Sequence, residues 1–461
     1  MENLIAAIDL GTTKISVAVG EKTNLGVKVI AFGEVPSKGI KRGRVENVRL
    51  ATQALNKALK QVEEQIGKKI NKALVGIAGQ DIKCIKPEPL TVPREKYDTL
   101  ITQEEILRIT QNTYHTPLDD GNKVLYSVPQ TYNVDNYMCV SEPVGMFGRN
   151  IQARFRLFVG KENSRMMIEN TLRMAGVEPL EVVLEPIASA KAVLSDEEME
   201  VGSILVDIGG GTTDVIVYHH NVIRYAGVVP FGGNSITEDI CIGCGISYNN
   251  AEYIKTNYGC CFSDYANPDQ KIVIPTMGSN GGKEVHVKVL SRIIQARMEE
   301  ILEAVCWHVE QSDFKDVIRS GMVLTGGGSK LGSLTNLANF VTGYEARLGS
   351  PNAFAIDPSS CELAKEATSS TAVGMLIHAF QRMEDEDIIY TNCVSSVTAA
   401  TVQPFISTPD PILITEDAVV AETEKSEAKP KGNGRGKKFL GKLKGFISGE
   451  SLFGDELTND V

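Results

Sequence analysis

The feature that most constrains the fold of this 461-residue chain is a short turn that occurs twice. Residues 8–15 and residues 206–215 both run from an apolar strand into Asp, then through a Gly/Thr turn into a second apolar strand. Glycine lets backbone approach a bulky anion, and the neighbouring N–H groups and Thr hydroxyls donate hydrogen bonds to it. An Asp at the mouth of such a turn can hold a cation, directly or through water. Two such hairpins facing each other predict a duplicated clamp for a polyphosphate.

A third glycine turn, Gly-Gly-Gly-Ser at residues 326–329, follows a short apolar strand and precedes an expected helix. Its N–H groups suit an anion or the edge of a ribose phosphate. The spacing is neither a Rossmann fingerprint nor a Walker A loop. Each of the three turns could be purely structural if it occurred alone. The prediction of a nucleotide-binding site therefore rests on the three turns together.

The composition and charge exclude several classes of protein. With 42% hydrophobic and 23% charged residues, the chain has the composition of an ordinary soluble globular protein. Its net charge of −11 argues against nucleic-acid binding, because phosphate contacts need a basic surface. The N-terminus lacks a basic leader and no apolar run reaches about eighteen residues, so we expect neither a signal peptide nor a membrane-spanning helix.

The nine cysteines are an odd number in a long chain, which is typical of a reducing compartment. Cys241 and Cys244, followed by Cys260 and Cys261, have some resemblance to a zinc site. However, Cys241 falls on an expected helix, and no residues separate the second pair. We therefore prefer packed or incidental thiols.

Alternating strand and helix patterns predict two α/β domains of like architecture with a cleft between them. Between about residues 87 and 160, prolines, a polar helix and two or three strands predict an inserted α+β subdomain. The expected helices lie at 47–66, 102–115, 165–175, 236–242, 289–309, 331–341 and 370–380, and the expected strands at 73–78, 123–134, 137–142, 151–160, 181–184 and 322–325.

The chain changes character from about residue 385. Residues 385–430 are acidic, contain prolines and show little periodicity, which predicts a disordered linker. The segment 431–448 has six basic residues and no acids, and in a helical projection its apolar side chains share one face. This pattern predicts a helix that lies on anionic lipid, with a partner-binding helix or a nucleic-acid tail as the alternatives. The expected membrane-contacting residues are Lys438, Phe439, Leu440, Lys442, Leu443, Phe446 and Ile447.

The three turns in this order resemble the actin-like ATPase superfamily, with matching segments at 8–15, 185–190, 206–215, 323–331 and 370–376. Within it, the chain looks most like the FtsA family of bacterial cell-division proteins. That family has an inserted subdomain, a linker and a membrane-targeting tail, and all three are present. Residues 232–240 are also similar to the family.

The resemblance implies a two-domain actin-like (duplicated ribonuclease H-like) α/β ATPase fold that binds ATP and Mg²⁺. It implies that Asp9 and Asp207 hold Mg²⁺ through water and that Lys14 faces the β/γ phosphates. Glu185 and Asp207 are the candidate catalytic residues, with Glu185 orienting the attacking water. A helix-capping carboxylate is the alternative for Glu185, and we expect slow or absent turnover. The implied nucleotide-binding residues are Asp9, Gly11, Thr12, Thr13, Lys14, Gly209, Gly210, Gly211, Thr212, Thr213, Gly233, Glu252, Lys255, Gly326, Gly327, Gly328 and Ser329.

The resemblance also implies how the chain is divided. The expected parts are domain 1 at 1–86, 161–205 and 362–384, the inserted subdomain at 87–160, the core of domain 2 at 206–244 and 321–361, its outer, partner-binding subdomain at 245–320, a disordered linker at 385–434 and a membrane-targeting tail at 435–461.

The function implied is that of an ATP-binding division protein that polymerises and tethers the tubulin-like ring protein FtsZ to the cytoplasmic face of the inner membrane at the division site. The implied partners are FtsZ, further copies of the chain, other division proteins and anionic lipids. A small-molecule kinase and an actin-like component of a pilus or secretion platform are the rival functions. Basic residues of the outer subdomain could pair with an acidic peptide, although a solvated basic face is the alternative; they are Lys271, Lys283, Lys288, Arg292 and Arg297.

Overall fold

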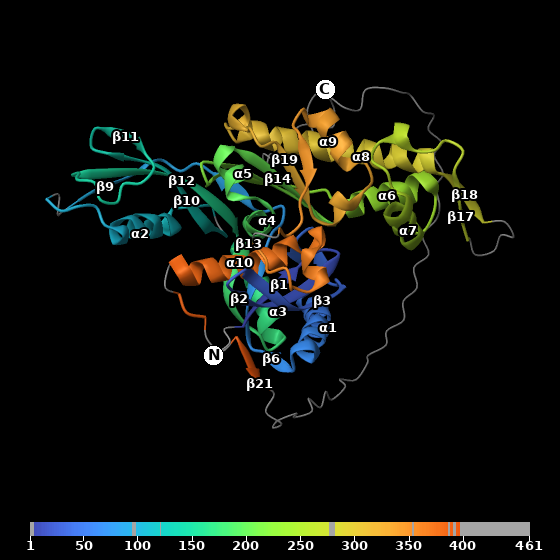
Figure 1. Cartoon of the computed structure of the whole chain (residues 1–461), viewed down its shortest axis with the longest axis horizontal. Helices are drawn as coiled ribbons and strands as arrows, with labels where there is room; N and C mark the ends of the chain where they lie inside the picture. The colour runs from blue at the N-terminus through green and yellow to red at the C-terminus, as the bar shows by residue number, and fades with distance from the viewer. Residues whose placement is uncertain are drawn as a thin grey trace, which may run out of the picture. The chain divides into compact units, whose positions relative to one another are not determined.

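The computed structural model describes residues 4–94, 98–119, 121–275, 282–352, 355–385, 388–390 and 393–396 (Figure 1). These residues belong to one unit, Met1–Val397. The tail predicted at 435–461, and the predicted linker beyond residue 396, lie outside the described residues.

Two five-stranded sheets with the same strand order form the two halves of this unit. In each half, two consecutive strands pair antiparallel, and the first of them pairs on its other side with a parallel strand. The duplication predicted from the two turns is therefore confirmed at the level of the sheets. The strand order is β13 (Glu178–Leu184), β7 (Lys72–Ile77), β1 (Ile5–Leu10), β2 (Lys14–Thr23) and β3 (Gly26–Pro36) in the first half, and β20 (Ala346–Leu348), β19 (Met322–Thr325), β14 (Ser203–Ile208), β15 (Thr213–His219) and β16 (Val222–Val229) in the second.

Helix α1 (Val48–Ile66) packs on the first sheet in the way its sequence predicts. The side chain of Asn47 accepts a hydrogen bond from the Leu50 N–H at the start of the helix, and Gly67 ends it with a φ of 64°. Its buried face carries the apolar residues at helical spacing, so burial of this stripe holds the helix against β3.

Two helices rich in small residues, α4 (Glu185–Val193) and α10 (Ser370–Asp385), cross at close range. A Cβ built on Gly374 would lie 1.8 Å from the carbonyl oxygen of Ala188. Glycine at this position is therefore what permits the approach of the two helices. The crossing brings Ser189 and Thr371 together beside the carboxylate of Asp207, near the end of β14.

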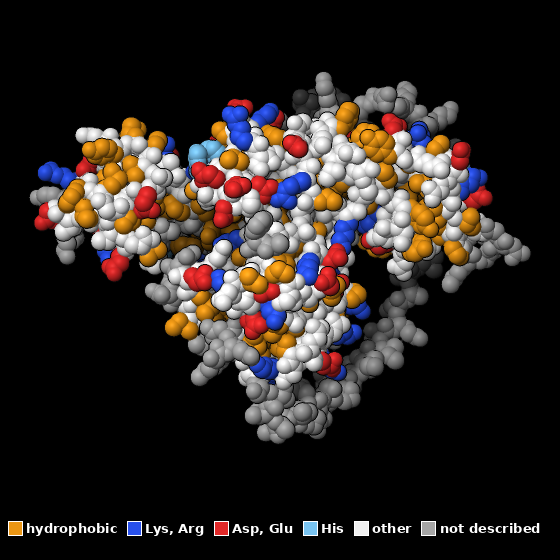
Figure 2. Space-filling view, viewed as in Figure 1, with side chains coloured by type: hydrophobic (Ala, Val, Ile, Leu, Met, Phe, Trp, Pro, Cys, Tyr) orange, Lys and Arg blue, Asp and Glu red, His pale blue; other side chains and the backbone are white. Residues whose placement is uncertain are grey.

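The inserted subdomain has a sheet and a core of its own (Figure 1). The strands and the helix expected here are confirmed, whereas β8 and β9 were missed because they are short and lie in or beside the proline-rich stretch. Figure 2 shows hydrophobic side chains gathered over this subdomain, where Tyr137, Met138 and Phe147 are exposed. Its elements are β8 (Lys83–Ile85), β9 (Leu90–Pro93), α2 (Gln103–Asn112), η1 (Thr113–His115), β10 (Asn122–Val134), β11 (Tyr137–Val140) and β12 (Asn150–Lys161).

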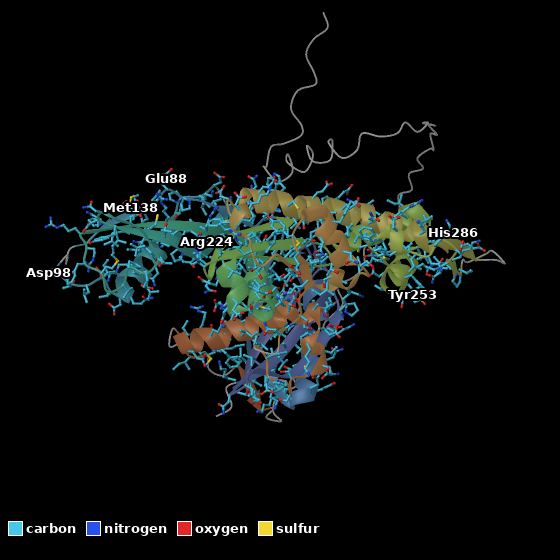
Figure 3. The ribbon with its side chains drawn as sticks, turned by 45° about the horizontal axis from the view of Figure 1, so that its top comes forward. Glu88, Asp98, Met138, Arg224, Tyr253 and His286 are labelled. Atoms are coloured by element: carbon cyan, nitrogen blue, oxygen red, sulfur yellow. The ribbon has the colours of Figure 1, made fainter. Side chains whose placement is uncertain are left out.

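Although the chain of the first half enters and leaves the inserted subdomain, buried polar contacts join the subdomain to the second half. Arg224 of β16 lies where the second half adjoins the inserted subdomain (Figure 3). Its guanidinium donates to the backbone oxygen of Gln130 at 3.3 Å and to its side-chain oxygen at 3.2 Å. Gln130 in turn donates to the carbonyl of Ile223 at 2.9 Å, and Arg156 donates to the carbonyl of Ser312 at 3.1 Å. The subdomain is thus bonded to both halves.

The remaining elements complete the two halves. The helix expected at 331–341 begins at residue 334, because residues 327–330 form a 3₁₀ turn. The helix expected at 236–242 extends over 233–244, so it begins at the second residue of the glycine pair, with Gly232 as its N-cap. These elements are β4 (Ile40–Lys41), β5 (Arg44–Val45), β6 (Lys68–Ile70), α3 (Glu162–Met174), α5 (Asp196–Val201), α6 (Gly233–Cys244), α7 (Tyr248–Tyr258), η2 (Ser263–Tyr265), β17 (Lys271–Ile274), β18 (Lys283–His286), α8 (Val287–Gln311), η3 (Lys315–Val317), η4 (Gly327–Lys330), α9 (Leu334–Thr342), η5 (Glu362–Lys365), η6 (Ala367–Ser369) and β21 (Val394–Ser396).

The four cysteines considered for zinc are free thiols. Cys244 and Cys261 are buried, and Cys241 and Cys260 are partly buried. Within the described ranges, no group of three or more His, Cys, Asp or Glu side chains is placed to hold a metal ion by itself.

Candidate functional site

A cavity of about 340 Å³ lies where the three glycine turns converge. The first turn comes from β1 and β2 of the first half, and the other two follow β14 and β19 of the second half. All but two of the predicted nucleotide-binding residues line this cavity. Those that do are Asp9, Gly11, Thr12, Thr13, Lys14, Gly209, Gly210, Gly211, Thr212, Gly233, Glu252, Lys255, Gly326, Gly327 and Gly328, together with the candidate catalytic residues Glu185 and Asp207.

Glycine is required in these turns because other atoms lie where a Cβ would be: those of the opposite half at Gly210 and Gly211, and those of the same half at Gly326. A Cβ on Gly210 would lie 1.8 Å from the Thr13 hydroxyl oxygen, and one on Gly211 would lie 2.6 Å from that of Thr12. Gly326 has a φ of +82°, and a Cβ on it would lie 2.2 Å from Asp207 Oδ1. A larger residue at any of these positions would push the loops apart.

Four acidic side chains surround the inner end of the cavity. Asp9 and Asp207 occupy equivalent positions in the two sheets, with Ser16 opposite Asp9 and Asp214 opposite Asp207 across the hairpins. Glu185 is the fourth and begins α4. Within the described residues, Ser16 Oγ and Asp214 Oδ1 are buried without a hydrogen-bond partner, so the equivalent positions of both hairpins carry an unsatisfied oxygen.

Burial raises the pKa of all four carboxyl groups. The pKa of Asp9 rises to about 7 because the group is desolvated, with Lys14 lowering it and Asp207 raising it further. The pKa values of Glu185 and Asp214 rise well above their ordinary range through burial and then through repulsion from the neighbouring carboxylates. Burial also raises the pKa of Asp207, although hydrogen bonds from Ser189 (2.7 Å) and Thr371 oppose the rise.

Mutual repulsion among buried carboxyl groups is relieved by a bound cation. The residues present therefore fit a divalent cation. Mg²⁺ commonly keeps several waters and uses one or two carboxylates plus phosphate oxygens, which suits a site without a cage of protein ligands.

The outer end of the cavity is formed by α6 and α7. Lys255 is buried, and its ammonium lies 2.7 Å from a Glu252 carboxylate oxygen and donates to the Gly233 carbonyl at 3.0 Å. Thr237 also donates to Glu252. These bonds fix the orientation of two charged side chains beside the glycine pair, as recognition of a ribose or base requires.

Three predicted residues are placed differently from our expectation. Thr213 and Ser329 are buried and do not line the cavity: Thr213 donates to the Phe231 carbonyl at 2.9 Å, and Ser329 donates to that of Gly326 at 2.7 Å. Both hydroxyls satisfy backbone groups of the turns themselves. Lys14 lines the cavity, but its ammonium is paired with Glu34.

Sequence reasoning missed several lining residues. Asp214 directly follows the second turn, and aligning the two hairpins would have marked it as the partner of Ser16. Thr371 lies in the segment 370–376, which we matched to the superfamily without assigning any of its residues to the binding site. The missed residues are Gly43, Asp214, Asn234, Thr256, Gly259, Lys330, Leu331, Ala367, Thr368 and Thr371.

The fold and this site define an actin-like protein. Among solved structures, the PilM–PilN type IV pilus biogenesis complex matches with a TM-score of 0.57 and 18% identity, over 81% of this chain and 98% of that chain. MreB5 of Spiroplasma citri bound to ADP matches with a TM-score of 0.50 and 14% identity, over 84% and 99%. At these identities, both matches bear on the fold alone.

Sequence comparison identifies the family. The family model "Cell division protein FtsA" matches residues 204–374, and the model "SHS2 domain inserted in FTSA" matches residues 79–159. The chain is 31% identical over 383 residues to cell division protein FtsA of Pseudomonas aeruginosa, covering 83% of this chain and 90% of the relative. It is 31% identical over 352 residues to that of Bacillus subtilis, covering 76% and 79%. The chain belongs to the FtsA family of cell-division proteins.

In the part of the chain that the structure describes, no helix is both long enough and apolar enough to cross a membrane.

Proposed function

We propose that the chain binds ATP with Mg²⁺ between the two halves and that the bound nucleotide controls its assembly into filaments. The observation that carries this proposal is the convergence of three glycine turns from both halves on one cavity with four acidic side chains. A ligand held this way contacts both halves at once, so its affinity differs between open and closed arrangements.

In this proposal, Asp9 and Asp207 hold Mg²⁺ through water, and the turn N–H groups bind the phosphates. Bound Mg²⁺ would neutralise phosphate charge. Glu185 faces the same cavity as both aspartates, and a Cβ on Gly76 would lie 2.7 Å from Glu185 Cγ, so glycine at 76 leaves room for this side chain. A raised pKa suits a proton acceptor, although a protonated carboxyl orients water poorly. We therefore expect slow turnover.

We further propose that the filament tethers the tubulin-like protein FtsZ to the cytoplasmic face of the membrane through the tail at 435–461. Membership of the cell-division family supports a division role. The basic amphipathic pattern of residues 437–447 supports lipid binding. We also propose that the chain is divided into domains at the boundaries that the resemblance implies.

The predicted partner surface needs one revision. Several basic side chains of the outer subdomain are already engaged: Lys271 lies 2.8 Å from Glu284 and Arg297 lies 2.6 Å from Asp239. Lys283 donates to the Gly245 carbonyl at 3.1 Å. An acidic peptide would have to compete with these bonds, so we propose that Arg292 and Lys288, which is 3.9 Å from Asp264, contribute more to peptide binding.

Electron microscopy on anionic lipid monolayers tests the proposal. The full chain should form filaments on the monolayer with ATP and Mg²⁺, and far fewer without nucleotide. A chain ending after Gly436 should bind nucleotide normally but leave the monolayer bare. Filaments that form equally without nucleotide would contradict nucleotide control.

The rival kinase function is separated by a second measurement. A kinase consumes ATP in proportion to an added small-molecule substrate, whereas the proposed protein consumes it slowly with or without one. A substrate that raises ATP consumption by orders of magnitude would favour the kinase.

A further inference from the structure

The strands β4 and β5 form a small hairpin whose turn lies beside the first two glycine turns, and of its two central residues Gly43 lines the cavity. Ile40 pairs with Val45 and Lys41 with Arg44, which leaves Arg42 and Gly43 as a two-residue turn. Gly43 lines the cavity, and its N–H donates to the Thr12 hydroxyl at 2.9 Å. A Cβ on Gly211 would lie 3.0 Å from Arg42 Cα. The turn therefore lies against both the first and the second glycine turn.

Arginine is an unusual residue for the backbone conformation of this turn. Arg42 has a φ of 49° and Gly43 one of 73°, and both positive values are those of a type I′ hairpin. Such turns favour Asn, Asp or Gly at the first position, because other side chains are strained there. A residue that departs from the local rule beside a binding cavity is a functional candidate.

The charges around the cavity give this arginine a role. Among the described residues, three lysines line the cavity and each is paired with a glutamate: Lys14 with Glu34, Lys255 with Glu252, and Lys330 with Glu366. These paired lysines bring little net positive charge to a polyphosphate.

By contrast, Arg42 makes no hydrogen bond or ion pair within the residues that the structure describes. The neighbouring Arg44 forms an ion pair with Asp81, with 3.1 Å between its Nε and the carboxylate Oδ2. A guanidinium presents several N–H donors in a fork that matches phosphate oxygens, and its stem spans several ångströms from Cα.

We propose that Arg42 binds the terminal phosphate of the nucleotide and gives the site its preference for ATP over ADP. This inference rests on the proposed nucleotide site. The turns bind the phosphates shared by both nucleotides, whereas Arg42 supplies a charge that only the triphosphate engages in full. Transition-state charge on a transferred phosphoryl group would be stabilised by the same guanidinium.

Calorimetric titration of the full chain with ATP and with ADP, each with Mg²⁺, tests the proposal. Arg42→Asn keeps the turn, since Asn tolerates a positive φ, and should weaken ATP binding about tenfold to a hundredfold. ADP binding should change by no more than about threefold, because the lost interaction is with the third phosphate. Arg42→Lys keeps the charge but not the forked donors, so its affinity for ATP should lie between that of the unmodified chain and that of Arg42→Asn.

Arg44→Asn is the matched control, because it removes the same charge from the same hairpin on the other side of the turn. It should leave both affinities near those of the unmodified chain. Equal losses in the two variants, or an unchanged ATP affinity in Arg42→Asn, would overturn the role of Arg42 while leaving the nucleotide site standing. Absence of binding by the unmodified chain would instead remove the proposed function, and this inference with it.

Discussion

At the scale of single residues, the protonation of Asp9 is coupled to the ligand we propose. Because burial raises the pKa of Asp9 to about 7, part of the protein carries a proton on this carboxyl at neutral pH. A bound cation favours the ionised form, so Mg²⁺–nucleotide binding must displace that proton. Asp214, whose pKa is also raised, can add to the proton release.

We therefore expect Mg²⁺–ATP binding to release protons at pH 7 and to strengthen as the pH rises through 7. The dependence should approach tenfold per pH unit for each proton displaced, and fade near pH 9, where Asp9 is ionised in the free protein. Calorimetry in two buffers of different ionisation enthalpy measures the release. Asp9→Asn is the control. It replaces the titratable carboxyl group with an amide, so the part of the pH dependence that comes from Asp9 should disappear. An affinity that falls as the pH rises from 6 to 8 would contradict the assignment.

At the scale of helices and strands, the crossing of α4 and α10 links packing to the site. Ser189 on α4 bonds both Asp207, at 2.7 Å, and Thr371 on α10, at 3.0 Å. The geometry of the Asp207 carboxylate thus depends on how closely the two helices approach. Gly374 permits this close approach, because the Ala188 carbonyl occupies the space that a side chain at position 374 would fill.

Gly374→Ala should force the helices apart. We expect the free energy of unfolding to fall by about 1–3 kcal/mol or more, as overpacking of a core does, and nucleotide affinity to fall with it because Ser189 and Thr371 shift. Urea unfolding monitored by circular dichroism measures the first effect. Gly327→Ala is the control for stability, since a Cβ there would meet only Thr368 Cγ2, at 3.8 Å. Equal stability of the two variants would show that the crossing is not tight.

The sequence predicts this architecture well where ligand chemistry or periodicity restricts the residue types. Anion-binding turns need Gly and Thr next to Asp, so both hairpins could be found, and α1 carries its apolar stripe and its cap in the sequence itself. Strands of two to four residues, such as β4, β5 and β8, give no alternation to detect. Contacts between distant segments leave no local trace either. The pairing of Lys14 with Glu34 and the burial of Thr213 could not be predicted because each depends on the fold around it.

At the scale of the whole molecule, the proposed function needs two parts of one chain: a folded unit that assembles into filaments and a C-terminal segment that binds the membrane. The folded unit contains the proposed nucleotide site, and residues 437–447 are the predicted lipid contact. Two glycines, Gly441 and Gly445, each cost about 1 kcal/mol relative to Ala in a helix, so in the proposed function this segment would become helical only on lipid. Attachment should therefore require both apolar insertion and anionic headgroups.

Phe439→Glu tests this dependence directly. Burying a Phe side chain contributes about 1.5–3 kcal/mol, so the variant should bind anionic liposomes at least about tenfold more weakly in co-sedimentation. The introduced carboxylate adds repulsion from the same lipids. Phe405→Glu makes the same chemical change in the predicted linker and should co-sediment like the unmodified chain. Liposomes of neutral lipid should retain little of either protein, because the lysines of the segment then lack a counter-charge. Undiminished binding of Phe439→Glu to anionic liposomes would exclude the segment as the membrane contact and move the attachment to another part of the chain.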